Sequence, residues 1–167
     1  MKKIAVYPGS FDPVTRGHLD IVHRACRLFD KVIVAVLSNP SKKGTFSVSE
    51  RLRMLEECLR DVPGAEVDAM SGLLADYLRA RGSHVIIRGL RVVSDLDYEF
   101  QMAAINRQLY PKVETVFLMP DERYTYLSSS IVKTVAQFGA SLDQFLPAPT
   151  ARMLRRKYGG AARKRPL

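Results

Sequence analysis

IAVYPGSFDPVTRGH, residues 4–18, is the stretch that decides the fold. Its first four residues, 4–7, are apolar, as in a buried strand. A loop that begins at Pro8 follows them. We expect Pro8 to end the strand and a helix to begin near Gly17, whose missing side chain lets a ligand approach the backbone closely. His18 then lies in the first turn of that helix, where free N–H groups and the helix dipole favour an anion. The stretch therefore predicts a strand, an anion-binding loop and a helix.

Four more apolar runs follow the first, and amphipathic segments separate them. Near-continuous hydrophobicity is typical of strands in a parallel sheet that is covered on both faces. The predicted strands are Ile4–Tyr7, Val32–Leu37, Glu66–Met70, Val85–Ile87 and Val116–Met119. The predicted helices are 17–29, 47–61, 73–81, 96–109, 129–138 and one that begins near Pro149, with Gly82 and Gly139 following two of the ends. The pattern predicts a doubly wound α/β fold with a five-stranded parallel sheet and helices on both faces, which binds ligands beyond the carboxyl ends of the strands.

The chain has 167 residues, the length of one domain, and a formal net charge of +9. Seven of its 26 basic residues follow position 150, where no acid occurs, so 19 basic and 17 acidic residues precede that point. The excess charge belongs to the end of the chain, and we expect one domain at 1–158 and a basic, flexible tail at 159–167. A contact of this tail with a polyanion is the alternative.

Several classes of protein are not expected from the composition. No run of 18 apolar residues exists and the first residues are too short for a signal peptide, so the sequence predicts no membrane partner and a cytoplasmic location. Cys26 and Cys58 form no CxxC motif, which argues against a disulfide scaffold or a thiolate zinc site. Asp12 and Asp121 do not form a fixed carboxylate cluster, so no metal site built by the protein alone is expected.

Basic and hydroxyl side chains follow the ends of three predicted strands. Lys42 and Lys43 come after the second strand, although two adjacent lysines are more often solvated surface residues. Arg88 and Arg91 flank a Gly-Leu pair directly after the fourth strand, and a guanidinium suits bidentate phosphate binding better than an ammonium does. Ser128–Ser130 opens a helix, where one serine serves as N-cap and the others leave hydroxyls free. Together these side chains predict a phosphate site at the carboxyl edge of the sheet.

Thr15-Arg16-Gly17-His18 is similar to the [T/H]xGH signature of the nucleotidyltransferase superfamily, and residues 1–147 as a whole resemble bacterial phosphopantetheine adenylyltransferases. The blocks that carry the resemblance are Tyr7–His18, Pro40–Lys43, Ile87–Arg91, Asp97–Glu99, Phe117–Pro120 and Ser128–Ser130. Their joint order and spacing make the resemblance specific. Two positions depart from the familiar pattern, Ser10 where threonine also occurs and Tyr124 where tryptophan also occurs, and both keep the chemistry.

The resemblance implies a Rossmann-like nucleotidyltransferase fold and the transfer of the adenylyl group of ATP to 4′-phosphopantetheine, giving dephospho-CoA and pyrophosphate. The residues that it implies in catalysis are His18, Lys42, Arg91 and Ser10. Those implied in ATP binding are Ser10, Phe11, His18, Gly89, Leu90, Arg91, Glu99, Tyr124, Thr125, Tyr126, Leu127, Ser128, Ser129 and Ser130. Those implied in binding 4′-phosphopantetheine are Ser10, Lys42, Leu74 and Arg88. It further implies Mg²⁺ held mainly by the ATP phosphates, a homohexamer and a place in coenzyme A biosynthesis.

Two other functions are compatible with parts of the sequence. Nicotinate mononucleotide or glycerol phosphate as acceptor would use the same [T/H]xGH loop, although Ile87–Arg91 together with Asp97–Glu99 favours phosphopantetheine. A nucleic-acid-binding protein would account for the net charge, but that charge lies in the tail, Trp is absent and aromatic residues do not alternate with basic ones. We therefore expect no specific nucleic-acid partner.

Overall fold

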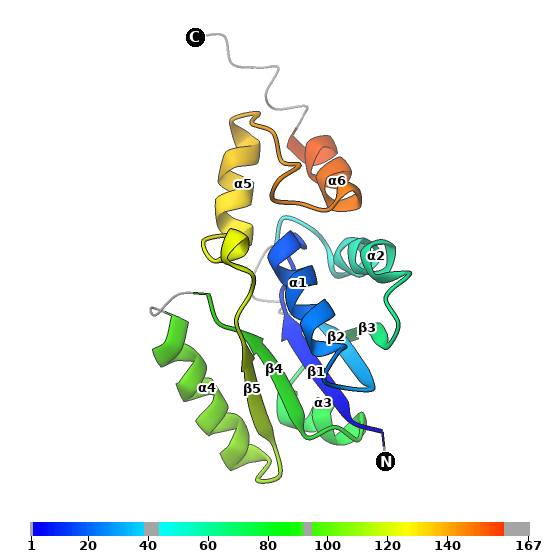
Figure 1. The fold of residues 1–167 in the computed structure, drawn as a ribbon, viewed down its shortest axis with the longest axis vertical. Helices are drawn as coiled ribbons and strands as arrows, with labels where there is room; N and C mark the ends of the chain where they lie inside the picture. The colour runs from blue at the N-terminus through cyan, green and yellow to red at the C-terminus, as the bar shows by residue number, and fades with distance from the viewer. Residues whose placement is uncertain (1, 39–43, 92–94, 159–167) are drawn as a thin grey trace.

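The computed structural model describes residues 2–38, 44–91 and 95–158. One parallel sheet has the strand order β3-β2-β1-β4-β5 (Figure 1). Its strands are β1 (Ile4–Gly9), β2 (Lys31–Leu37), β3 (Ala65–Met70), β4 (Val85–Gly89) and β5 (Glu114–Leu118). The chain proceeds outward from β1 to β3 and then crosses to β4, on the other side of β1. This reversal between β1 and β4 creates the switch point at which open α/β sheets bind ligands.

Helices connect the strands and cover the sheet. The helices described are α1 (Arg16–Ala25), α2 (Val48–Leu59), α3 (Leu74–Ala80), α4 (Leu96–Leu109), α5 (Ser129–Gln137), α6 (Ala148–Tyr158) and the short 3₁₀ helix η2 (Glu122–Tyr124). Within the described ranges, no helix combines the length and apolar character that crossing a membrane requires.

Both faces of the sheet are covered, as the apolar strands predict. Successive residues of β1 point to opposite faces, so that Ala5 and Tyr7 belong to one apolar core and Val6 to the other. The larger core is closed by side chains of α1, α2, α5 and α6, and the smaller by α3, whose Leu78 is fully buried. Figure 1 shows α3 behind the sheet and α4 beside β5. The predicted doubly wound α/β fold is confirmed.

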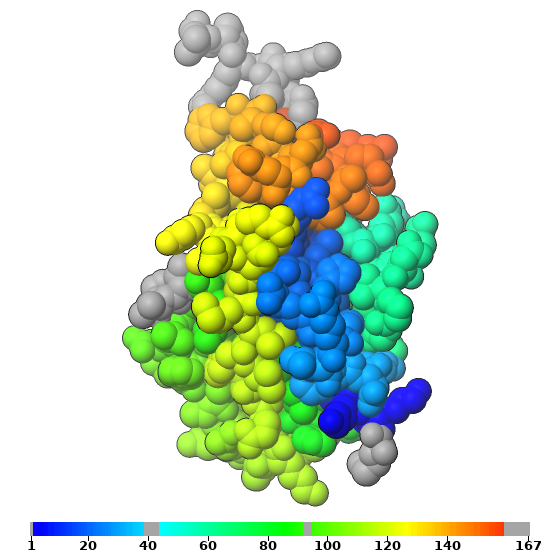
Figure 2. Space-filling view, in the orientation of Figure 1, coloured from blue at the N-terminus to red at the C-terminus, as the bar shows by residue number. Residues whose placement is uncertain are grey.

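The start of α1 is held by segments from the C-terminal part of the chain. Figure 2 shows α6 and the loop before it covering one end of the molecule, with the yellow segment that leads into α5 lying against the blue α1. The N–H group of Arg16 donates to the Phe145 carbonyl at 3.0 Å, and the Ser129 hydroxyl donates to the Pro13 carbonyl at 2.8 Å. These bonds fix the loop between β1 and α1, which the sequence predicts to bind anions.

Strand β1 is longer than predicted. It continues through Pro8 to Gly9, in register with Ala35 and Val36 of β2, so the prediction that Pro8 ends the strand is wrong. Proline removes one N–H donor, but its φ is compatible with extended backbone and its carbonyl still accepts. The Pro8 carbonyl accepts from Nη1 of Arg88 at 2.9 Å.

Helix α1 ends at Ala25, four residues before the predicted end. The N–H group of Arg27 bonds to the carbonyl of Arg24, three residues back, at 3.2 Å, so the chain leaves the helix through a tighter turn. The two glycines predicted to follow helices do so in left-handed conformation, with φ of +62° at Gly82 and +76° at Gly139. Local turn geometry therefore sets these helix ends.

Candidate functional site

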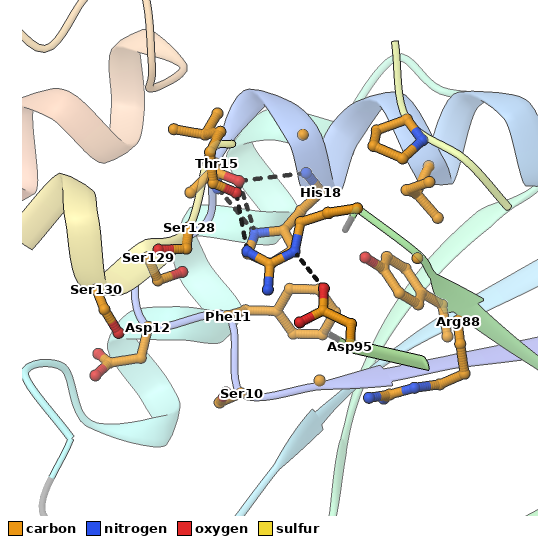
Figure 3. A pocket seen from close by; sticks show the side chains of 18 of the residues that line it. Ser10, Phe11, Asp12, Thr15, His18, Arg88, Asp95, Ser128, Ser129 and Ser130 are labelled. Atoms are coloured by element: carbon orange, nitrogen blue, oxygen red, sulfur yellow. Dashed lines mark hydrogen bonds and ion pairs between the residues drawn. The ribbon is translucent and has the colours of Figure 1, made fainter. Parts of the chain in front are cut away.

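A cavity of about 870 Å³ opens at the carboxyl edge of the sheet, beside β1 and β4. The predicted site residues that line it are Ser10, Phe11, His18, Arg88, Gly89, Arg91, Glu99, Tyr124, Leu127, Ser128, Ser129 and Ser130. Figure 3 shows the three serines on one side of this cavity and Arg88 on the opposite side. Leu90, Thr125 and Tyr126 do not line it, and the predicted Lys42 lies outside the described residues. The structure thus brings most of the predicted residues to one place.

His18 completes the cap of α1 while it lines the cavity. The backbone N–H of Thr15 donates to His18 Nδ1 at 3.0 Å, and the N–H of His18 donates to the Thr15 hydroxyl at 3.3 Å (Figure 3). This reciprocal arrangement is a capping box in which a histidine takes the place of the usual glutamate. The ring of Phe11 packs edge-on against the imidazole, with 5.1 Å between ring centroids. Backbone and aromatic contacts together hold the imidazole in one orientation.

The same contacts determine which nitrogen of His18 carries the proton. Burial, and then the charge of Arg91, lowers the pKa of His18 from 6.5 to about 4, so the imidazole is neutral at neutral pH. Because Nδ1 accepts a hydrogen bond from the backbone of Thr15, the proton of the neutral ring is on Nε2. Nε2 has no hydrogen-bond partner among the described residues. His18 therefore offers the cavity one N–H donor of fixed direction.

The lowered pKa of His18 predicts a dependence of stability on pH. Between about pH 4 and 6.5 the unfolded chain binds a proton at His18 that the folded chain does not bind, so the free energy of unfolding rises with pH in this range. The contribution of His18 is complete above pH 6.5 and is lost as the pH falls toward 4. Urea denaturation of the wild type and of His18→Gln, which does not titrate, measures it. Acidification should lower the stability of the wild type relative to that of His18→Gln, and a constant difference would contradict the prediction.

Arg91 connects the end of β4 to the segment before α5. Its Nη1 donates to the carbonyl of Leu127 at 3.1 Å, and its Nε lies 3.3 Å from a carboxylate oxygen of Asp95. Arg88, three residues earlier, is paired with Glu99 and donates to the backbone of β1. The two arginines that the sequence predicts as phosphate ligands are therefore both oriented by acidic residues at the start of α4.

The three serines at the start of α5 have different partners. The hydroxyl of Ser128 accepts from the N–H of Ile131 at 3.2 Å and is the N-cap of the helix. Ser129 donates to the Pro13 carbonyl, while the hydroxyl of Ser130 has no partner among the described residues. The prediction that one serine serves as N-cap is confirmed. The prediction that the other two keep free hydroxyls is wrong for Ser129, which bonds to Pro13, and holds for Ser130 among the described residues. All three serines line the cavity at the start of α5, where a helix has free N–H groups.

Asp12 joins the segments around the cavity. Its carboxylate accepts from the backbone N–H groups of Thr45 at 2.8 Å and Phe46 at 2.9 Å, and lies 3.3 Å from Nζ of Lys133. The Asp12 side chain is only 11% exposed, so these partners replace its lost hydration.

Arg51, in α2, also lines the cavity and was not predicted from the sequence. No sequence signal distinguishes it from the exposed arginines of the chain.

Arg51 is nearly buried and ties together the ends of two strands. Its Nη1 donates to the Ser10 carbonyl at 2.7 Å, just beyond β1, and to the Leu37 carbonyl at 3.1 Å, at the end of β2. A guanidinium has enough donors to serve both carbonyls at once. Arg51 therefore fixes the backbone of Ser10, whose side chain is a predicted ligand, and adds positive charge to the cavity wall.

Removal of the Asp12 carboxylate should cost stability. Asp12→Ala leaves two backbone N–H groups and the Lys133 ammonium without partners, and we expect the free energy of unfolding to fall by about 2–4 kcal/mol. Urea denaturation measures this change. Asp143→Ala is the matched control, because the Asp143–Arg155 pair is exposed and its loss should cost less than about 1 kcal/mol. Equal losses in the two variants would contradict the role given to Asp12.

A second, mostly apolar cavity of about 290 Å³ adjoins the first. The two cavities share Pro8, Leu37, Arg88, Tyr98 and Glu99. Apolar side chains that line the second cavity alone include Met70, Leu73, Leu74, Ile86, Met102 and Ile105. The predicted Leu74 therefore lies away from the polar cavity, on the far side of Arg88. A ligand that fills both cavities must have one charged and one largely uncharged part.

The donor set of the cavity bears on metal binding. Among the described residues, no group of three or more His, Cys, Asp or Glu side chains is placed to hold a metal ion. Asp12 has both carboxylate oxygens engaged by N–H groups and by Lys133, so it offers no open set of oxygen ligands. Mg²⁺ prefers six oxygen ligands. The cavity therefore fits this ion when ligand phosphates and water supply most of the oxygens.

The fold and the cavity define a nucleotide-binding α/β protein of the nucleotidyltransferase type. The sequence pattern of the family described as cytidylyltransferase-like matches residues 6–135. Curated phosphopantetheine adenylyltransferases of Alkalilimnicola ehrlichii (53% identical, covering 98% of this chain and 95% of the relative) and Dictyoglomus thermophilum (54%, covering 93% and 94%) are similar to the chain. The chain therefore belongs to the cytidylyltransferase-like family and, within it, to the phosphopantetheine adenylyltransferases. The predicted family and enzyme class are confirmed.

Solved structures support the fold. A Plasmodium falciparum nicotinic acid mononucleotide adenylyltransferase in complex with NaAD has a TM-score of 0.66 at 14% identity, covering 95% of this chain and 97% of that one. A bifunctional NMN adenylyltransferase/ADP ribose pyrophosphatase from Francisella tularensis, in complex with AMP and a manganese ion, has a TM-score of 0.69 at 18% identity. The match covers 98% of this chain and about half, 53%, of the Francisella protein. At these identities the likeness concerns the fold alone.

Proposed function

We propose that this enzyme of coenzyme A biosynthesis transfers the adenylyl group of ATP to 4′-phosphopantetheine, giving dephospho-CoA and pyrophosphate. The observation that carries the proposal is the pair of adjoining cavities that share Arg88. The polar cavity suits a nucleoside triphosphate. The apolar cavity suits the pantetheine arm, and the arginine between them suits the phosphate at the end of that arm.

The proposed reaction is an in-line displacement at the α-phosphorus of ATP. An oxygen of the acceptor phosphate forms a bond to this phosphorus, the bond to the bridging α–β oxygen breaks, and pyrophosphate leaves with the electron pair. A phosphate monoester is largely dianionic at neutral pH, since its second pKa is about 6, so no general base has to remove a proton. Catalysis then depends on placing the reactants in line and on donors that stabilise the charge of the transition state.

The proposed roles rest on the family resemblance, and most of the groups involved also line one of the two cavities. The groups proposed to stabilise the transition state are His18, Arg91, Lys42 and the Ser10 hydroxyl. His18 is suited to this task because Thr15 fixes the direction of its Nε2–H donor and because its imidazole is neutral at neutral pH. Arg88 and Leu74, with Ser10 and Lys42, are proposed to bind 4′-phosphopantetheine. The proposed ATP-binding residues are Ser10, Phe11, His18, Gly89–Arg91, Glu99 and Tyr124–Ser130.

Three further properties belong to the proposal. Mg²⁺, held mainly by the ATP phosphates, would act as a Lewis acid when bound and stabilise their negative charge. A homohexamer is proposed from the family resemblance, and the exposure of three large apolar side chains of α4, Phe100, Ile105 and Leu109, supports some form of self-association. A cytoplasmic location, as predicted from the sequence, is the third proposed property. Light scattering of the purified protein tests the hexamer.

Pyrophosphate release with a panel of acceptors tests the function. The purified chain is incubated with ATP and Mg²⁺ and with 4′-phosphopantetheine, nicotinate mononucleotide or glycerol phosphate. Release with 4′-phosphopantetheine alone supports the proposal, and formation of dephospho-CoA is checked by mass spectrometry. Release with either of the other acceptors, and none with 4′-phosphopantetheine, would overturn the acceptor but keep the adenylyltransferase class.

A further inference from the structure

Tyr7, on the central strand β1, places a phenol in the wall of the polar cavity. The residue is only 6% exposed, and its ring packs edge-on against that of Phe11, with 5.4 Å between ring centroids. Its backbone lies in register with Val34 of β2, inside the sheet. The strand and the aromatic contact together hold the ring in one orientation.

The hydroxyl of Tyr7 faces a position where the protein has no side chain. A Cβ atom on Gly89, at the end of β4, would lie 3.8 Å from this hydroxyl oxygen and 3.3 Å from Cγ1 of Ile21. Glycine therefore leaves open the space beside the hydroxyl, and all three residues line the polar cavity.

This hydroxyl has no hydrogen-bond partner among the described residues, whereas a buried phenol ordinarily finds one. In the same part of the chain, the Thr150 hydroxyl is the only polar side-chain atom that is both unbonded and closed off from its surroundings. The Tyr7 hydroxyl is thus unbonded but still open to the cavity. A ligand in the polar cavity can supply the missing partner.

The charges around Tyr7 favour a neutral donor beside an anion. Burial raises the pKa of Tyr7 well above its ordinary value, although the charges of Arg88 and Arg91 act to lower it. The phenol is therefore protonated at neutral pH, and its O–H group can donate to an oxygen of a ligand. The influence of both guanidinium groups places the hydroxyl within electrostatic reach of the two arginines that are proposed to bind phosphate.

The face of the sheet indicates which ligand the hydroxyl meets. Ile87 belongs to the same apolar core as Tyr7, so Gly89, two residues later, lies on the face of Tyr7 and Arg88 lies on the other face. Arg88 borders the apolar cavity as well as the polar one, whereas Tyr7 and Gly89 line the polar cavity alone. Tyr7 therefore lies on the side of the proposed nucleotide and away from the proposed pantetheine arm.

On these grounds, and resting on the proposed function for the identity of the two substrates, we propose that the Tyr7 hydroxyl is a ligand of the adenylyl group. Its O–H group donates to an oxygen of the ribose or the α-phosphate. ATP and the product dephospho-CoA share this group, and 4′-phosphopantetheine lacks it. The same contact is thus made before and after the transfer.

Tyr7→Phe tests the proposal, since it removes one oxygen atom and keeps the ring that packs against Phe11. Calorimetry measures the dissociation constants of ATP, dephospho-CoA and 4′-phosphopantetheine separately. Those of ATP and dephospho-CoA should each rise about tenfold through the loss of one hydrogen bond, and that of 4′-phosphopantetheine should stay within about twofold. In steady-state kinetics, KM for ATP should rise and KM for 4′-phosphopantetheine should not.

Tyr110→Phe is the matched control, because the Tyr110 ring lies against the guanidinium of Arg79 and lines neither cavity. All three dissociation constants should be unchanged in this variant. Unchanged nucleotide binding in Tyr7→Phe would overturn the proposal and leave Tyr7 a residue of the core. Weaker binding of 4′-phosphopantetheine alone, or equally weaker binding of all three ligands, would overturn it too, as an acceptor contact or a general disturbance of the site.

The proposed function and the role of Tyr7 fail in different ways. A wild type that binds ATP but neither binds 4′-phosphopantetheine nor releases pyrophosphate with it refutes the proposed function. Binding of ATP to the wild type and to Tyr7→Phe still decides whether the hydroxyl contacts the nucleotide.

Discussion

His18→Ala should lower kcat by about 10²–10³-fold, with little change in KM for either substrate. The reason is that the Nε2–H group of His18 is directed into the cavity by the backbone of Thr15 and is aimed, in the proposed reaction, at charge that develops on the transferred phosphoryl group. A donor that acts on developing charge affects the transition state more than the bound substrates. Steady-state kinetics of pyrophosphate release measures both constants.

His18→Gln separates catalysis from the structural role of the same side chain. Glutamine at this position of a capping box can accept the N–H of Thr15, so α1 keeps its cap. His18→Ala removes that cap and should lose about 1 kcal/mol of stability as well. If both variants lose turnover while only the alanine variant loses stability, the loss of turnover belongs to the imidazole. A rise in KM with kcat unchanged would make His18 a binding residue and would refute its role in the transition state.

The strands, the helices and the location of the cavity could be predicted because they depend on local patterns. Apolar runs and the glycines that follow two of the helices can be recognised in the sequence, and parallel strands bring their carboxyl ends together by topology alone. The predicted end of β1 at Pro8 was wrong because a single proline costs the strand only one donor, and a distant side chain, that of Arg88, bonds to its carbonyl.

The connections within the site could not be predicted from local patterns. Arg51 looks like any helical arginine in the sequence, yet it lies nearly buried beneath the ends of β1 and β2. Asp12 bonds to residues more than thirty positions away, and such a partner leaves no trace in the spacing of either segment. The bond that makes His18 part of the helix cap, from the N–H of Thr15 to Nδ1, also leaves Nε2 as the donor to a ligand. The sequence does not show this bond, so it could not show which nitrogen faces the ligand.

Arg91→Ala should reduce kcat/KM for ATP by about 10²–10³-fold, mainly through kcat. Arg91 donates to the carbonyl of Leu127 and is paired with Asp95, so its guanidinium is fixed between the end of β4 and the segment that leads into α5. In the proposed reaction it faces the polyphosphate. Arg91→Lys should recover little of the loss, since an ammonium cannot serve the carbonyl, the carboxylate and a phosphate in the geometry of a planar guanidinium.

The charge of Arg91 also gives a readout that is independent of turnover. Arg91 is the second cause, after burial, of the lowered pKa of His18, so Arg91→Ala should raise that pKa part of the way toward its ordinary value. Titration of the His18 ring protons by NMR measures the change. A raised pKa together with lost turnover would show that Arg91 and His18 are close enough to act on the same bound anion. An unchanged pKa would mean that the guanidinium lies too far from the imidazole to act with it on the same phosphoryl group.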